Sequence, residues 1–405
     1  MKIKDIVTFV SKSITPQKGV TYNLYSLPSF DEGKTFEVLD GADIQSNKYE
    51  VPNKCILFNK LNVRFKRVWR IDSQDENKIA STEFLPLVVD EDVVDFQYCY
   101  YLLISDKITN YLCGQNTNTS GSHKRIDPDH FLNIEIKLPK MSIQRQIGKT
   151  LSALDRKIVL NKQINDNLEA MAKQLYDYWF VQFDFPNEEG KPYKSSGGAM
   201  VWNEKLKREI PQGWLCGTLL DIAEYTNGLA CQKNRPTDDR KLPVIKIKEM
   251  HDGLSADTEW VKADIPDDVK VFDGDVLFSW SASLEVMLWT YGNGGLNQHI
   301  FKVTSKNGYP RSFYFYQLIH YIGVFKQMAE ARKTTMGHIT QDHLRQSTIA
   351  LPPNVDIANK LEEKLCPIFD AIVKNSQEIM TLTKQRDELL PLLMNGQAMV
   401  IYHLS

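Results

Sequence analysis

The chain has 405 residues, of which 42% are hydrophobic and 25% charged, with a formal net charge of −2, and this composition is typical of a globular protein of about two or three domains. No apolar stretch reaches the ~18 residues of a membrane-spanning helix, and the first residues show no apolar segment of signal-peptide length. The six cysteines are scattered and never form Cys-x-x-Cys, which argues against a disulfide framework or a zinc site and favours a cytoplasmic location.

A basic run, KLNVRFKRVWR, occupies 60–70 and holds five basic side chains and no acidic one. Alone, such a run is typical of a solvated strand or hairpin face. It also suits contacts with the phosphates of a nucleic acid. The candidate DNA contacts in this run are Lys60, Arg64, Lys66 and Arg67.

A polar loop that contains glycine, GQNTNTSGSHKR, follows at 114–125. Its side chains are of the types that hydrogen-bond phosphates and base edges, although a single loop of this composition is ordinarily a solvated one. Its candidate contacts are Asn116, Asn118, Ser122, His123, Lys124 and Arg125.

The next segment reveals an internal repeat. IDPDHFLNIEIKLP at 126–139 returns as ITQDHLRQSTIALP at 339–352, with six identities at an offset of 213 residues. Weaker echoes join FQYCYYLL (96–103) to RSFYFYQL (311–318), CILF (55–58) to DVLF (275–278), and KIKDIVTFV (2–10) to TLLDIAEYT (218–226). The chain therefore consists of two copies of one unit, each a mixed domain followed by a long helix. Two copies are too few for a solenoid and favour pseudo-two-fold symmetry, which suits a partner of matching symmetry.

The first long helix is predicted within 138–184, where apolar residues recur in steps of four and three with one break around Asn161. Steps averaging about 3.5 residues are typical of a coiled-coil seam, and the helix from Ile143 to Phe180 would be roughly 55 Å long. The predicted seam comprises Ile147, Leu151, Leu154, Ile158, Asn161, Ile164, Leu168, Met171, Leu175 and Tyr178. A buried seam asparagine fixes register and partner, whereas one at a stutter faces water, and the sequence leaves both alternatives open.

The segment 185–214 is rich in Pro, Gly, Ser and Lys, which predicts a linker or surface excursion before the second domain at 215–350. A second polar loop, EARKTTMGHIT at 330–340, stands where 114–125 stands in the first copy, and this equivalence favours a binding role for both loops. A tryptophan at 280 could stack on a base, although a core position is the commoner fate. The candidate contacts of the second domain are Lys233, Arg235, Trp280, Asn297, Gln298, Arg332, Lys333, Thr334, Thr335 and His338.

The second long helix and tail occupy 351–405, with a seam that includes Leu365, Ile372, Asn375 and Ile379. Pro367 predicts either a kink or the end of one helix and the start of another, and Asn395–Gly396 is a plausible stop. The simplest arrangement pairs the two long helices antiparallel, with one domain at each end, so that they act as a ruler.

No catalytic signature accompanies these features. The chain has no GxGxxG, Walker A, HExxH or GxSxG motif and no cluster with metal-ligand spacing. The sequence therefore gives no reason to expect an enzyme.

The order of these parts resembles the specificity subunit of Type I restriction-modification systems. The matching text is LPKMSIQRQ, LSALDRKIVLNKQINDNLEAMAKQLYDYWFVQF, IPQGW and LLPLLMNGQ, and it extends over essentially the whole chain. The match is looser in the second helix, where LPPNVDIANK lacks the glutamine and Pro367 interrupts the pattern.

The resemblance implies an α+β fold with two target recognition domains, 1–137 and 215–350, joined by two long antiparallel coiled-coil helices. It implies that each domain reads one half of a split site in double-stranded DNA through the major groove. The helices would set the gap and dock two modification subunits, which bind S-adenosylmethionine and methylate adenine. Restriction subunits would join them and cleave unmodified DNA with ATP and Mg, so no cofactor or metal is expected in this chain.

Two other classes remain. A coiled-coil scaffold or adaptor that does not bind DNA would show no clustering of Lys, Arg, Asn and Gln on equivalent faces of both domains. A specificity region borrowed by a single-chain restriction enzyme would be fused to a methylase or nuclease, and neither is present in the sequence.

Overall fold

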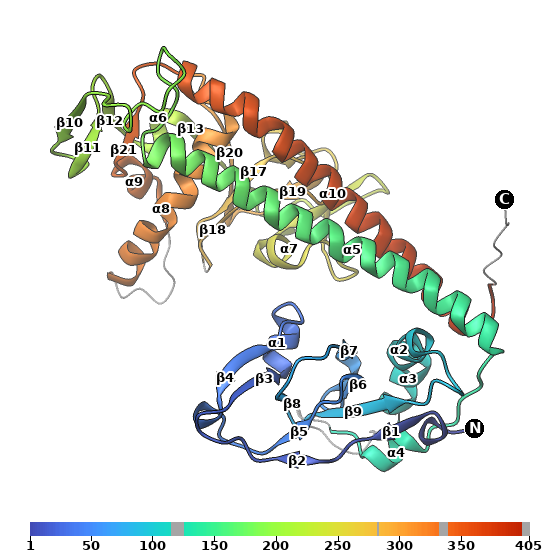
Figure 1. Cartoon of the computed structure of the whole chain (residues 1–405). Coiled ribbons are helices and arrows are strands. Elements are labelled where there is room, and N and C mark those ends of the chain that lie inside the picture. Colours follow the sequence, from blue (N-terminus) through green and yellow to red (C-terminus); the bar gives the residue numbers. More distant parts are fainter. Residues whose placement is uncertain (115–124, 282, 332–338, 399–405) are drawn as a thin grey trace, which may run out of the picture. The chain divides into compact units, whose positions relative to one another are not determined.

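The computed structural model describes residues 1–114, 125–281, 283–331 and 339–398. It divides into two compact units: unit 1 comprises Met1–Lys157 and Leu382–Ser405, and unit 2 comprises Ile158–Thr381. Each unit holds one mixed α/β domain together with parts of two long helices, α5 (Met141–Tyr176) and α10 (Asp356–Met394) (Figure 1). Within the described residues, no helix is long and apolar enough to cross a membrane.

Two sheets form the domain of unit 1. The antiparallel sheet β1-β9-β6-β7 comprises β1 (Val7–Phe9), β6 (Lys54–Asn59), β7 (Val68–Asp72) and β9 (Phe84–Val89). The sheet β2-β5-β8-β3-β4 comprises β2 (Ser13–Ile14), β3 (Thr21–Tyr25), β4 (Glu37–Asp40), β5 (Lys48–Glu50) and β8 (Lys78–Ala80). The helices are α1 (Leu27–Asp31), α2 (Phe96–Ile104), α3 (Asp106–Gly114) and α4 (Pro128–Leu132), with 3-10 turns at Ile3–Asp5, Gly41–Asp43 and Val63–Phe65.

Unit 2 repeats this plan. Its antiparallel sheet β13-β20-β17-β18 comprises β13 (Ala223–Asn227), β17 (Val276–Ser279), β18 (Glu285–Leu288) and β20 (Ile300–Ser305). A second sheet, β15-β14-β19-β16, comprises β14 (Lys241–Ile245), β15 (Trp260–Lys262), β16 (Lys270–Val271) and β19 (Gly294–Leu296). The helices are α6 (Leu219–Ile222), α7 (Ile247–Asp252), α8 (Arg311–Ala331) and α9 (Gln341–Arg345), with 3-10 turns at Cys231–Lys233 and Asp267–Val269.

Strand register confirms the repeat. In unit 1 Val7 pairs with Val89 and Ile56 with Leu87. In unit 2 the corresponding strands pair Ala223 with Ser305 and Val276 with Val303. Helices α4 and α9 lie at the same 213-residue offset as the repeated sequence motif, from Pro128 to Gln341. The two domains are therefore copies of one fold.

The first and last strands of each domain meet. In unit 1 Lys2 and Glu135 form a β-bridge, and Ile136 N donates to Met1 O at 2.9 Å. In unit 2 β12 (Leu215–Gly217) pairs antiparallel with β21 (Ile349–Leu351). Each domain is thus closed by its own ends just before its long helix begins.

The segment 185–214, which we predicted to be a linker or surface excursion, is folded. It contains the hairpin of β10 (Met200–Asn203) and β11 (Arg208–Pro211). Phe185 stacks between Tyr193 and Trp214, with ring centroids 4.8 Å and 5.4 Å away. Because these rings belong to the core of unit 2, the linker prediction is wrong, and its Gly- and Ser-rich composition concealed three anchoring aromatic residues.

In unit 1 the domain meets the long helices partly through a polar cluster. Ile147 and Leu151 of α5 and Leu393 of α10 belong to the same buried core as the sheet. Beside them Asp155 accepts hydrogen bonds from the hydroxyl of Tyr101 on α2 and from Arg386 Nη1 of α10, the latter at 3.1 Å. A second guanidinium, that of Arg70 on β7, lies 3.7 Å from the same carboxylate.

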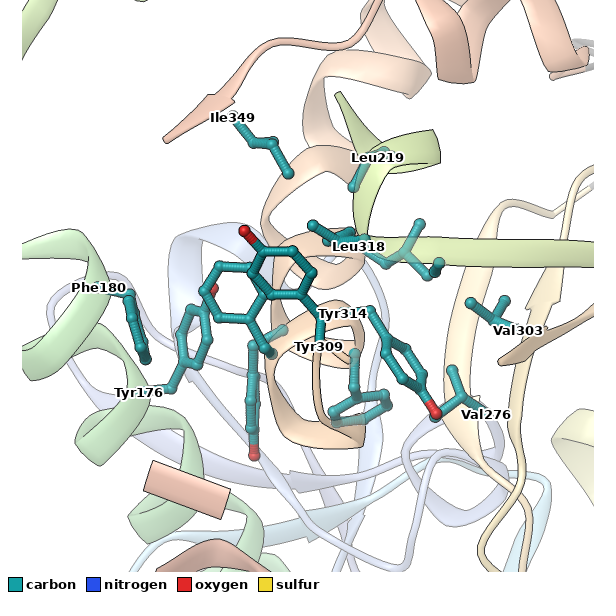
Figure 2. Close-up of a cluster of buried hydrophobic side chains, with 14 of the residues drawn as sticks. Tyr176, Phe180, Leu219, Val276, Val303, Tyr309, Tyr314, Leu318 and Ile349 are labelled. Carbon is teal, nitrogen blue, oxygen red and sulfur yellow. The ribbon is translucent and has the colours of Figure 1, made fainter. Parts of the chain in front are cut away.

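In unit 2 the domain meets the long helices through aromatic side chains. Figure 2 shows Tyr176 and Phe180, from the end of α5, within a cluster that includes Tyr309, Tyr314 and Leu318. The Tyr176 ring lies 4.9 Å from Tyr316, and the Phe180 ring 4.9 Å from Phe313, between centroids. A π-helical turn, Asp177–Val181, ends the helix here.

Helix α10 runs from Asp356 to Met394 without ending at Pro367, so the two-helix alternative is wrong. Pro367 and Glu363, whose carbonyl loses its usual partner, are both exposed residues, so water can hydrate that carbonyl. The predicted stop is confirmed: Gly396 has φ +70°, and Gly396 N donates to Leu393 O.

In unit 2 the two long helices run antiparallel and share a polar layer. Asn161 Nδ2 donates to Glu378 Oε2 at 2.8 Å, and Asn165 Nδ2 donates to Ser376 Oγ at 3.0 Å. Asn375 Nδ2 completes the layer by donating to Asn165 Oδ1 at 2.9 Å. The buried-asparagine alternative is therefore confirmed for Asn161, and the sequence reading missed Asn165.

Seam predictions divide into three groups. Buried seam residues are Leu151, Ile158, Asn161, Leu365 and Ile372, and half-buried ones are Leu154, Leu168, Asn375 and Ile379. Ile164 and Met171 are 37% and 57% exposed, so their assignment to the seam is wrong. The buried neighbours Asn165 and Ala172 take the inward positions, because regular steps of three and four residues from Ile158 and Asn161 reach positions 165 and 172 of the continuous helix rather than 164 and 171.

Candidate nucleic-acid interface

In each unit, a hairpin loop of the antiparallel sheet lies beside the end of the polar loop. The β6–β7 connection accepts a hydrogen bond at Lys60 O from Ile126 N, at 2.9 Å. The β17–β18 connection accepts the equivalent bond at Trp280 O from Ile339 N, also at 2.9 Å. In unit 1 a β-bridge between Leu61 and Arg125 extends the contact. The fold therefore brings the two candidate segments of each domain together at the same place.

The basic run of unit 1 forms a tight loop before β7. Its 3-10 turn, Val63–Phe65, is flanked by Asn62 at φ 51° and Lys66 at φ 48°. A left-handed conformation is uncommon outside glycine and costs of order 1–3 kcal/mol, so surrounding contacts must hold it. The buried Val63 side chain anchors the turn in the core of the unit.

Two cations of this loop are positioned by carboxylates. Lys66 Nζ lies 2.6 Å from Asp106 Oδ1. Arg67 makes two hydrogen bonds of 2.7 Å to Asp31. These pairs are partly exposed, so each stabilises the fold by at most about 1 kcal/mol, and their main effect is to fix the direction of the side chains.

Arg125, at the edge of the polar loop, is paired in the same way. Its Nη2 and Nε donate to Glu83 at 2.5 Å and 3.1 Å. Sequence reading missed all three acidic partners, because they come from distant elements and no local pattern marks them. Lys60 is half-buried and contributes its backbone to the contact between the loops.

Arg64 differs from these cations. It is exposed, and its Cζ lies 4.7 Å from the centroid of the Phe65 ring. The Arg67 Cζ lies 4.9 Å from the same ring, which is itself 52% exposed. Phe65 was not among the candidate contacts. Its position inside the basic run, as an aromatic residue between cationic ones, was the signal that could have marked it as a part of the site.

In unit 2, Trp280 is anchored on the edge of the core. Its Nε1 donates to Asn227 Oδ1 at 3.1 Å, and its ring contacts those of Phe301 and His299, at centroid distances of 5.8 Å and 5.6 Å. The half-buried Gln298 lies against His299, with 3.3 Å between Nε2 atoms. His299 is exposed and joins this group, although we did not single it out from the sequence.

Asn297 does not fit the prediction. Its side chain is 5% exposed, and this burial argues against a direct contact with DNA. The residue instead serves the turn before β20, where its backbone N donates to Ile245 O at 3.0 Å. Lys233 and Arg235 are exposed at and just after the turn Cys231–Lys233. The remaining candidates lie outside the described residues: Asn116, Asn118, Ser122, His123, Lys124, Arg332, Lys333, Thr334, Thr335 and His338.

The described part of the chain holds no group of His, Cys, Asp and Glu side chains that could bind a metal ion. Burial raises the pKa of the Cys55 and Cys99 thiols to about 12, which keeps both protonated at neutral pH. Neither thiol is therefore suited to nucleophilic catalysis.

Comparison with other proteins agrees with this geometry. Residues 1–170 and 211–385 match the family model of the Type I restriction modification DNA specificity domain. The specificity subunit of the Type I restriction enzyme MjaIX from Methanocaldococcus jannaschii is 25% identical over 336 residues, covering 80% of this chain and 74% of that protein. The HindI specificity subunit from Haemophilus influenzae is 24% identical over 401 residues, covering 84% and 86%.

A crystal structure shares the fold. The S subunit of a Type I restriction-modification system from M. genitalium superposes with a TM-score of 0.61 at 12% identity, covering 100% of this chain and 96% of that one. At this identity the likeness concerns the fold alone. The family match, by contrast, occurs twice and spans most of the sequence, so the chain belongs to the Type I restriction-modification DNA specificity family, whose members are non-catalytic DNA-recognition subunits.

Proposed function

We propose that this chain reads a bipartite site in double-stranded DNA, with one domain for each half-site. The observation that carries the proposal is the repeated pairing of a hairpin loop with a polar loop, through Ile126 and Lys60 in unit 1 and Ile339 and Trp280 in unit 2. Two copies of one reading surface match a site made of two separated halves. Cationic and polar side chains at the first surface suit phosphates and base edges in the major groove.

The long helices would set the gap between the half-sites and dock two modification subunits. Leu160, Ile164 and Met171 are 50%, 37% and 57% exposed, and their spacing places them on one face of α5. A stripe of exposed apolar residues is typical of a protein-binding surface. We assign it to the modification subunits, which would bind S-adenosylmethionine and methylate adenine.

Restriction subunits would complete the complex and cleave unmodified DNA with ATP and Mg. The chain itself would carry no cofactor. All of these partners would act on chromosomal or invading DNA, so the proposal places the complex in the cytoplasm.

The decisive experiment is co-expression of the chain with its modification subunit, followed by genome-wide mapping of methyladenine. We expect one bipartite motif, and replacing 1–137 with another recognition domain should change only one half of it. A change in both halves would refute one domain per half-site. Inserting four residues in α5, about one helical turn, should alter the gap and leave both halves unchanged.

Binding measurements separate this function from that of a scaffold. The affinity of the purified complex for DNA should fall steeply as salt rises, because bound cations displace counterions from the phosphates. A complex that binds DNA with no salt dependence, or not at all, would favour the coiled-coil scaffold.

A further inference from the structure

The loop between β6 and β7 holds one arginine in a way that differs from its neighbours. Lys66, Arg67 and Arg125 each direct their donors at a carboxylate. Arg64 has no such partner: within the described residues, no acceptor lies at hydrogen-bonding distance from its guanidinium. In the described part of the chain its N–H groups are thus left for a ligand.

The guanidinium of Arg64 is nevertheless oriented. It lies over Phe65 with Cζ 4.7 Å from the ring centroid, and this cation–π contact fixes the position of the guanidinium without using its N–H donors. The ring is fixed in turn by Arg67, whose Cζ lies 4.9 Å from the centroid and whose two bonds to Asp31 hold it in place. Arg64 is thus held by a chain of contacts that runs from Asp31 through Arg67 to Phe65.

The backbone supports the same arrangement. Left-handed residues stand at both ends of the turn, and the buried Val63 faces the core while Phe65 faces solvent. The Phe65 ring, which is 52% exposed, holds the Arg64 guanidinium at the surface of the turn. This costly geometry is consistent with a binding site.

A planar guanidinium with free, directed donors matches the O6 and N7 acceptors of guanine in the major groove, which it can bind with two hydrogen bonds. A phosphate would also accept these donors, but a phosphate contact does not require a stacked, directed side chain. We propose that Arg64 reads a guanine in the half-site of domain 1 and that Phe65 is its positioning residue. This proposal rests on the proposed function of the chain.

The test uses the complex of the full chain with its modification subunit. Arg64→Ala, Arg64→Lys and Phe65→Leu would be compared with the wild type by methyladenine mapping and by binding to the mapped site. The control is Arg145→Ala, which removes an exposed arginine from α5 outside the recognition domain.

We expect both Arg64 variants to lose selectivity at one G·C pair of one half-site and to bind the original site roughly 10- to 100-fold more weakly. Phe65→Leu should relax the same position by a smaller factor, and Arg145→Ala should change nothing. Unchanged selectivity at the other positions of the same half-site demonstrates that domain 1 folds in the variants.

Other results would overturn the assignment. If Arg64→Lys kept the wild-type motif and affinity while Arg64→Ala weakened binding to all sequences alike, Arg64 would contact a phosphate. An unchanged motif for Arg64→Ala would remove the residue from base reading but leave the bipartite function standing. A wild-type complex that neither binds nor methylates a bipartite site would overturn the proposed function and this assignment with it.

Discussion

The two recognition domains are attached to the long helices by different chemistry. In unit 1 the carboxylate of Asp155 contacts Tyr101, Arg70 and Arg386 beside an apolar contact made by aliphatic residues of both long helices. In unit 2 the joint is a continuous aromatic core that includes Tyr176 and Phe180 (Figure 2). The two attachments therefore differ in emphasis: unit 1 adds a charged hydrogen-bonded cluster to aliphatic packing, whereas unit 2 relies mainly on buried aromatic rings.

The difference has consequences for stability and for precision. Apolar burial stabilises in proportion to area and is not directional. Hydrogen bonds to a charged group contribute less in total, but they specify one geometry, and an unpaired member is costly. We expect the joint of unit 2 to dominate stability and that of unit 1 to depend on salt.

The largest effect should come from Phe180→Ala. This change removes a ring that lies 4.9 Å from Phe313 and is 4% exposed, so the free energy of unfolding of unit 2 should fall by about 3–5 kcal/mol. Urea denaturation followed by far-UV circular dichroism measures it. The neighbouring Val181→Ala, at a 38% exposed position, is the control and should stay within about 0.5 kcal/mol.

A smaller loss is expected from Asp155→Asn. The arginines at 70 and 386 would keep their positions without the carboxylate, which should destabilise unit 1 by about 2 kcal/mol. The loss should shrink as salt rises, because salt screens the wild-type pairs. Asp166→Asn, on the exposed side of α5, is the matched control. An equal loss for both variants would mean that the polar cluster is not a joint.

In the polar layer, Asn161→Leu should raise the free energy of unfolding by about 1 kcal/mol. The Asn161 side chain is fully buried, and its Oδ1 has no hydrogen-bond partner among the described residues. Urea midpoints of this variant and of the exposed control Asn167→Leu measure the gain. A loss of stability would show that the bond to Glu378 outweighs the unpaired oxygen.

The smallest expected effect concerns the rates at which two cysteine thiols of unit 1 react with a labelling reagent. Burial raises the pKa of Cys99, on α2, to about 12, so at pH 8 it should react with a thiol reagent only through opening of unit 1. Asp155→Asn should speed this labelling several-fold, because Tyr101 lies on the same helix, and Phe180→Ala should not. The exposed Cys113 should react at once in every variant. Mass spectrometry of labelled peptides gives both rates.

The repeat, the long helices and the helix stop at Gly396 were predictable because each leaves a local or periodic pattern. The inward position of Asn165 was missed because the apolar Ile164 was assigned to the seam in its place, although regular steps from Ile158 lead to residue 165. The partners of Asn165 on the other helix were not predictable, because they lie far away in the sequence. The composition of 185–214 also suggested a linker, because the rings of Phe185 and Trp214 come into contact only when the chain folds.

The candidate site was predicted in part. Its basic run and its polar loops were visible as composition, and the fold places their described ends together. The partners that orient the cations, such as Asp31 for Arg67, come from elements far away in the sequence. The burial of Asn297 was not predictable, because a polar residue in a glycine-rich turn gives the same sequence pattern whether it is buried or exposed.

The closing of each domain by its own ends affects how such a chain can evolve. A segment that enters and leaves at neighbouring points, as at the bridge of Lys2 and Glu135 or the ladder of β12 and β21, is a cassette. Recombination at the two flanks can replace it with a foreign version while the helices keep their sequence. Under the proposed function, a lineage would thereby acquire a new specificity in a single genetic exchange, without any compensating change elsewhere in the chain.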